Sequence, residues 1–197
     1  PSSSPLPTSS SVTSVGTHSA VRIIGTELYW LPIETRVPLK FGTETLTSVT
    51  CARVCLHVTR NDGIECTGWG ETPLSVQWAW PSSTSYAERH EALKSFCGKL
   101  AEAWAGFSAV GHALEIGHAF QRDVLPALLT SFNRTERANG EPLPYLAALI
   151  CCSAFDLALH DAYGNAVGMP VYETLTAKYL EHDLAWYLTP ADGSSVD

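Results

Sequence analysis

The chain has 197 residues, enough at ~150 residues per domain for one domain with a substantial core, or for one domain and part of a second. Hydrophobic residues make up 45% and charged residues 16%, a globular composition that excludes a wholly disordered chain. The 12 Lys and Arg residues against 20 Asp and Glu residues give a net charge of −8 without a basic cluster, which argues against a nucleic-acid partner. No apolar run reaches the ~20 residues of a membrane-spanning helix, so no membrane partner is expected.

Two compositional features bear on order and location. Residues 1–19 are mostly Ser, Thr and Pro with little to bury, so we expect a disordered leader. The six cysteines are scattered and fit no disulfide framework. Cys151 and Cys152 lie in an apolar stretch, where a free thiol behaves as a small hydrophobe. Reduced thiols predict a cytoplasmic protein.

Residues 21–70 have the alternating pattern of β-strands. Apolar residues at positions 52, 54, 56 and 58 alternate with other types, which indicates a strand with one buried face. Asp62 and Gly63 follow at once, and Asp-Gly between alternating segments is a strong hairpin signal. Residues 64–70 are then the returning strand, and residues 21–31, bounded by Pro32, supply a third. The sequence therefore predicts a three-stranded antiparallel sheet.

After Pro81 the hydrophobic period changes to that of a helix. Ser85 and Glu88 have the spacing of a capping box, and Gly106 or Gly111 is suited to end the helix. Its apolar stripe consists of Leu93, Phe96, Cys97, Leu100, Trp104 and Phe107.

Further helical patterns fill the rest of the chain. One runs from about residue 118 to 132, where Pro126 begins a new turn or kinks the helix. Residues 145–163 are almost all apolar or small and predict a helix buried on most sides, ended by Gly164, Gly168 and Pro170. Residues 171–179 are expected to form one more short helix. Strands followed by helices indicate an α+β layer structure.

Residues 184–188, Leu-Ala-Trp-Tyr-Leu, predict a fresh strand near the end of the sequence. A single strand without a visible partner is a poor place for a domain to finish. We therefore expect this strand to open a further domain.

Two local motifs resemble one family. Asp62-Gly63 is followed by Gly68-Trp69-Gly70-Glu71, a hairpin and a strand ending in G-x-G-E. Residues 154–172, AFDLALHDAYGNAVGMPVY, follow the pattern A-x-D-x-A-L-W-D-x-x-G-K-x-x-G-x-P-V-Y, with His160 in place of Trp and Asn165 in place of Lys. Over about residues 21–189, the chain resembles the N-terminal part of the enolase superfamily, in its mandelate racemase and muconate-lactonizing branch.

The resemblance implies an α+β capping domain, a three-stranded antiparallel sheet followed by a helical bundle, that closes over a C-terminal (β/α) barrel. The expected division is a leader over 1–19, a capping domain over 20–145, a linker helix region over 146–183 and a truncated first barrel strand over 184–197. A complete barrel needs ~250 residues, so the rest of it is expected beyond Asp197.

The activity that the resemblance implies belongs to the parent enzyme: a Mg²⁺-dependent racemase, epimerase, cycloisomerase or acid-sugar dehydratase that removes a proton next to a carboxylate. Its Lys or His base and its metal-binding carboxylates would lie in the barrel, so this chain is expected to hold no catalytic residue, metal ligand or cofactor. The implied partner is a small carboxylate-containing substrate, and the parent is expected to be a homo-oligomer. The alternative is a stand-alone, non-catalytic binding or interaction module with the same fold.

The candidate substrate-binding residues are Phe41, Trp78 and Trp80. They lie in residues 32–47 and 72–83, and the resemblance implies that these two loops reach over the barrel mouth. Aromatic residues are enriched both in pockets and at interfaces, so pocket lining and packing of the cap against the barrel both remain open. Trp104, by contrast, lies on the helical stripe and is expected in the core.

Three other groups could suggest chemistry. Asp156 and His160 are spaced as a general acid–base pair, but a structural hydrogen bond in a buried helix is the favoured interpretation. Asp161 is expected to tie its helix to a neighbouring segment. Gly68-x-Gly70 lacks the third glycine and helix of a phosphate loop, which favours a tight turn.

Zinc is a weak hypothesis for Cys51, Cys55 and His57 on one strand face. Cys51 and Cys55 would lie ~13 Å apart at ~3.4 Å per residue, too far for a single ion. Cys55 and His57 alone would still need two further ligands from elsewhere.

Overall fold

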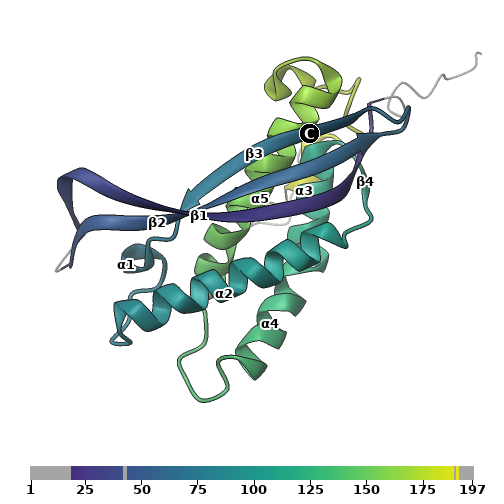
Figure 1. Cartoon of the computed structure of the whole chain (residues 1–197). Helices are drawn as coiled ribbons and strands as arrows, with labels where there is room; N and C mark the ends of the chain where they lie inside the picture. The colour runs from purple at the N-terminus through teal and green to yellow at the C-terminus, as the bar shows by residue number, and fades with distance from the viewer. Residues whose placement is uncertain (1–18, 42–43, 189, 191–197) are drawn as a thin grey trace, which may run out of the picture.

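The computed structural model describes residues 19–41, 44–188 and 190, and its helices pack against one face of an antiparallel sheet (Figure 1). The predicted leader, residues 1–19, lies outside this range except for Ser19. The sheet has the strand order β3-β2-β1-β4, so the predicted three strands are confirmed and a fourth, of two residues, is added. The strands are β1 (Val21–Phe41), β2 (Glu44–Arg60), β3 (Glu65–Pro73) and β4 (Val110–Gly111).

The hairpin between β2 and β3 forms where Asp62-Gly63 predicts it. Gly63 has φ +85°, a left-handed conformation that glycine adopts without strain. The Arg60 N–H donates to the Ile64 carbonyl at 2.9 Å and closes the turn.

The first strand does not stop at Pro32. β1 continues to Phe41 and stays paired with β2, Pro32 opposite Thr50 and Leu39 opposite Leu46. β4 pairs only with Val21 and Arg22, so the rest of β1 is an edge among the described residues, where proline is tolerated. We call residues 32–41 and 44–50 the hairpin arm; it extends beyond the helices in Figure 1. The predicted loop is thus a strand pair.

The first predicted helix is confirmed as α2 (Tyr86–Ala105). The Ser85 hydroxyl accepts from the Glu88 N–H at its start, and Gly106 is its C-cap. The stripe from Leu93 to Trp104 is buried in the main core, and Phe107 packs partly buried against it.

The second helical pattern is two helices, α3 (Ala113–Asp123) and α4 (Leu125–Thr135). Pro126 lies in the first turn of α4, where its missing N–H would have no intrahelical partner. Its ring therefore begins a helix instead of kinking one.

The long apolar helix is α5 (Tyr145–Val167), which packs on β3, β2 and α2 in the same core as the sheet. It ends at Gly168, with φ +72°, and runs through Gly164. By length and composition alone it could cross a membrane, but 56% of its most apolar window is buried inside the fold, as in a core helix.

The two motifs that carry the family resemblance contact each other across β3 and α5. Gly68 and Gly70 lie within β3, so the tight turn favoured for them is wrong. A Cβ atom at Gly68 would lie 2.0 Å from the Ala162 nitrogen, and one at Gly70 would lie 2.1 Å from the Ala154 carbonyl oxygen. Strand and helix backbones therefore approach as closely as glycine and alanine permit.

The C-terminal segment is helical where a strand was expected. Residues 184–188 contain α6 (Leu184–Tyr187), whose first turn is capped by the Asp183 side chain. Its Trp186 and Tyr187 rings pack on His118 of α3 at centroid distances of 5.1 Å each. A strand would need a neighbouring strand to pair with. Residues 184–188 have no such partner among the described residues, and they pack through aromatic rings on α3. The helix expected over 171–179 is the four-residue 3₁₀ turn η2 (Val171–Thr174).

Candidate substrate-capping site

The hairpin arm has its own small core and an apolar surface. Leu46, Val49 and Cys51 are buried together with Leu31 against them, separately from the main core. The Thr35 hydroxyl donates across the arm to the Thr47 carbonyl at 3.1 Å. Exposed apolar side chains remain on it: Ile33 (41%), Val37 (68%) and Leu39 (49%). The Phe41 side chain lies outside the described residues, so its role stays a prediction.

The predicted loop over residues 72–83 contains the one-turn helix α1 (Val76–Ala79), beside the base of the arm (Figure 1). Trp78 is 50% exposed on this helix, which leaves its proposed substrate contact open. Trp80 is only 2% exposed and packs in the main core. The prediction that Trp80 lines a substrate pocket is therefore corrected: its indole is enclosed within this domain.

A buried arginine, which the sequence pattern did not single out, fixes α1. Arg89 of α2 is 3% exposed and donates to the Trp80 carbonyl at 2.6 Å and the Val76 carbonyl at 3.5 Å. Val76 is the first residue of α1 and Trp80 is its C-cap residue, so one guanidinium binds carbonyls from both ends of this single turn. An arginine on an amphipathic helix ordinarily predicts an exposed side chain, so only the fold shows this role.

A hollow of about 330 Å³ separates the arm from the helices. Four consecutive arm residues, 45–48, line one side, and Gln77 of α1 and Tyr86 of α2 line the other. The Ser75 hydroxyl donates to the Gln77 amide oxygen at 3.0 Å and fixes the amide. The lining offers hydroxyl and amide groups suited to the polar part of a small ligand, one residue from the exposed Trp78.

Asp156 and His160 form a structural contact. His160 Nδ1 lies 2.8 Å from the Asp156 backbone oxygen and 3.8 Å from its carboxylate, so the hydrogen bond is to the main chain. The Asp156 carboxylate lies against Gly117 of α3, where an added Cβ would come within 2.2 Å of Oδ1. Burial raises the pKa of this carboxyl. Asp156 therefore packs α5 against α3 and His160 bonds within α5, which favours the structural interpretation over an acid–base one.

As expected, Asp161 links its helix, α5, to a neighbouring segment, the strand β3. The Trp69 N–H of the edge strand β3 donates to Asp161 Oδ2 at 2.8 Å. One helical turn later, the Asn165 amide donates to the Thr67 carbonyl at 2.9 Å. The departure from the family pattern at Asn165 thus supplies a second tie between α5 and β3.

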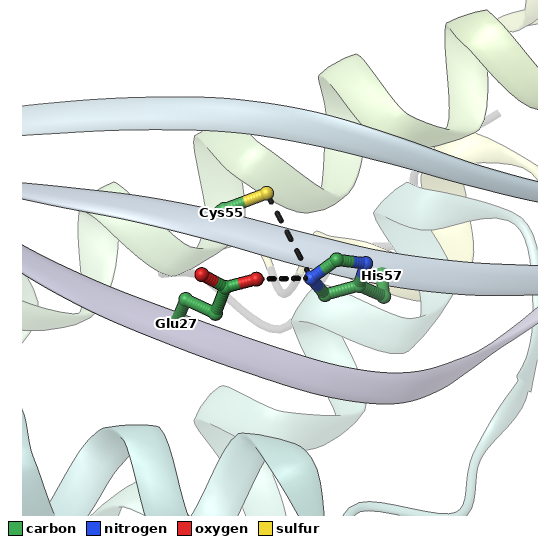
Figure 2. A group of neighbouring side chains, drawn as sticks. All are labelled: Glu27, Cys55 and His57. Carbon is green, nitrogen blue, oxygen red and sulfur yellow. Dashed lines mark hydrogen bonds and ion pairs between the residues drawn. The ribbon is translucent and has the colours of Figure 1, made fainter.

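Side chains of three types that can bind metal ions lie together on the face of the sheet opposite the helices. Among the described residues, one group of acidic, His and Cys side chains is close enough to share an ion: Glu27, Cys55 and His57 (Figure 2). Mg²⁺ prefers an octahedron of oxygen ligands, and a set with one thiol and one imidazole does not fit it. No step of magnesium chemistry therefore falls to these residues.

No family model matches the chain, and the search of curated proteins returned no match. Solved structures do match. The L-Ala-D/L-Glu epimerase from Bacillus subtilis is 20% identical with a TM-score of 0.44, over 78% of this chain and 34% of that one. The dipeptide epimerase from Cytophaga hutchinsonii, solved with Mg and a dipeptide, is 20% identical with a TM-score of 0.45, over 78% and 33%. The L-talarate/galactarate dehydratase from Salmonella typhimurium is 15% identical with a TM-score of 0.41, over 88% and 37%.

The chain thus spans about a third of the length of the solved proteins it matches. With identities of 20% or less and TM-scores below 0.5, the functional proposal rests on the chain's own contacts. A mandelate racemase/muconate lactonizing enzyme-like protein from Rubrobacter xylanophilus also matches, at 20% identity with a TM-score of 0.42, over 78% of this chain and 33% of that one.

Proposed function

We propose that this chain is the N-terminal substrate-capping domain of a Mg²⁺-dependent enzyme of the enolase superfamily. The observation that carries the proposal is the contact between the two motifs. Gly68 and Gly70 pack directly on the helix row Ala154, Ala158 and Ala162, so both resemblances belong to one structural unit. The Asp161 carboxylate of the same motif then holds the strand at Trp69.

The arm and α1 would supply the capping surface. Ile33, Val37 and Leu39 present apolar surface that a barrel or a bound substrate would cover, and the polar hollow lies at their base. In this proposal Trp78 contacts the substrate or the closed interface. A small carboxylate-containing molecule is the substrate class that the family resemblance supports.

The proton-abstracting base and the Mg²⁺ carboxylates would come from a barrel domain. The proposed reaction is removal of a proton next to a carboxylate, in a racemase, epimerase, cycloisomerase or acid-sugar dehydratase. The cap's contribution would be to exclude water and orient the substrate, which aligns the reacting carbon with groups on the other domain.

We also propose a cytoplasmic location, which is supported by all six cysteines being free. The family resemblance alone supports a homo-oligomeric parent.

Deuterium exchange next to the carboxylate of dipeptides and sugar acids tests the function. The complete product of the gene should catalyse this exchange with Mg²⁺, and residues 1–197 alone should not, because the base and metal ligands would be absent. A gene that ends after Asp197, or a complete product that binds ligands without any exchange, would favour the stand-alone module. Mg²⁺-dependent exchange by residues 1–197 alone would contradict the proposed division of roles.

A further inference from the structure

Three side chains of different chemistry meet on the sheet face that the helices leave uncovered. Glu27 of β1 lies directly opposite Cys55 of β2 in the strand register. His57 follows two residues later on β2 and therefore points to the same face. Figure 2 shows all three side chains directed toward one another.

Their ligand atoms have the spacing of a metal site. His57 Nε2 lies 2.8 Å from Glu27 Oε1 and 3.9 Å from Cys55 Sγ, and all three atoms lie within 4.8 Å of one another. Bond lengths of ~2.0–2.3 Å place the ligands of a tetrahedral zinc ion roughly 3–4 Å apart. Small side-chain rotations would bring the three atoms onto one ion without moving either strand.

We propose that Glu27, Cys55 and His57 form a binding site for Zn²⁺ or a similar borderline divalent ion, with water as the fourth ligand. A thiolate, an imidazole and a carboxylate are the ligand types zinc takes in proteins. The thiolate and carboxylate together balance the charge of the ion. The site is independent of the proposed capping role, because it lies on the helix-free face and shares no residue with the arm.

A neighbouring side chain holds the carboxylate in place. The Tyr29 hydroxyl donates to Glu27 Oε2, the oxygen that does not face His57. Ligating carboxylates in metal sites are commonly oriented by such outer hydrogen bonds. The bonds from Tyr29 and His57 also lower the pKa of Glu27, so the carboxylate is ionised and ready to bind.

Binding would displace one proton from the thiol. Cys55 is 4% exposed, and burial together with the Glu27 charge raises the pKa of its thiol, so the sulfur is protonated at neutral pH without metal. The ion takes the thiolate, His57 binds through Nε2 as neutral imidazole with the ring proton on Nδ1, and the thiol proton leaves to solvent. No oxidation or reduction is involved.

Titration with Co²⁺ under reducing conditions tests the site in the 197-residue chain, because cobalt in place of zinc reports its ligands by absorption. One equivalent should give a thiolate-to-cobalt charge-transfer band, which added Zn²⁺ abolishes. Cys55→Ser should remove the band, and His57→Gln should weaken binding at least ~10-fold. Tyr29→Phe should weaken it by roughly 10-fold or more, as for other outer-shell partners.

Cys51→Ser is the matched control. Cys51 is on the same strand and face and is also buried, but ~13 Å from Cys55 at ~3.4 Å per residue. Its variant should keep the wild-type cobalt spectrum and affinity. Melting curves without metal establish that each variant is folded. Absence of a thiolate band in the wild type, or a band that persists in Cys55→Ser, would overturn the site and would leave the capping proposal unaffected.

Discussion

Two tryptophans two residues apart meet opposite environments at the end of α1. Trp78 is 50% exposed, whereas Trp80 is 2% exposed and packs in the main core, with its carbonyl bound by Arg89. Of these two tryptophans, only Trp78 is left with the alternatives of pocket lining and interface packing, which also stay open for Phe41.

Trp78→Ala in the complete enzyme should lower kcat/KM and leave the melting temperature almost unchanged. An exposed indole contributes little to the folded free enzyme and gains its contacts when the site closes. Trp104→Ala is the control: Trp104 is fully buried and stacked 3.9 Å from Phe120, so its loss should cost roughly 3–5 kcal/mol. If Trp78→Ala melts as early as Trp104→Ala but keeps its kcat/KM per folded molecule, Trp78 is not a substrate residue.

His112 makes folding stability depend on pH. Its Nδ1 accepts from the Leu114 N–H at the start of α3, its Nε2 is 2.8 Å from Thr174, and burial lowers its pKa from 6.5 to about 4. The unfolded state therefore binds the proton more readily, so stability is full above about pH 6.5 and falls toward pH 4, by roughly 3 kcal/mol.

Urea unfolding of wild type and His112→Asn over this range checks the prediction. Asparagine also caps helices but does not titrate. The difference in unfolding free energy between the two proteins should shrink as the pH falls. A difference that stays constant from neutral pH to pH 4 would rule out His112 as the titrating group.

At the scale of elements, the sequence predicts features that depend on one segment better than contacts between two segments. The period of α2, its Ser85 cap and the turn at Gly63 depend on local sequence, and each is confirmed. The sequence does not predict the arm, because a proline such as Pro32 ordinarily ends a strand, and only its edge position allows β1 to continue. The pairing of Glu27 with Cys55 depends on strand register across ~30 residues of chain, which no local pattern contains.

The contact of β3 with α5 gives a sharp test at this scale. Gly70→Ala should lower the free energy of unfolding by roughly 3 kcal/mol or more, because its methyl group would overlap the backbone of α5 at Ala154 and Ala158. Gly98→Ala in α2 is the matched control: no atom lies within 4 Å of its Cβ position, so it should stabilise the helix by up to ~1 kcal/mol. Equal denaturation midpoints for the two variants would contradict the close strand–helix approach.

At the scale of the molecule, large apolar side chains stay exposed outside the main core, and several of them lie on the arm and on the C-terminal segment. The arm exposes Val37, and the C-terminal segment exposes Leu184 (65%) and Trp186 (46%). Apolar surface that a second domain would cover is expected to self-associate when that domain is absent. Residues 1–197 should therefore form dimers or larger species at micromolar concentration in analytical ultracentrifugation. A clean monomer that unfolds cooperatively would favour the stand-alone module.

The capping role itself is tested most directly by removing the arm from the complete enzyme. Leu31 and Cys51 are paired across the strands, so an Asn-Gly turn can join them in place of residues 32–50. The main core does not include the arm, and the shortened protein should fold with a similar melting temperature. We predict that its kcat/KM falls by at least ~100-fold, because the substrate is no longer oriented or shielded from water. A folded, arm-less enzyme that retains wild-type kcat/KM would contradict the proposal that this domain caps the substrate.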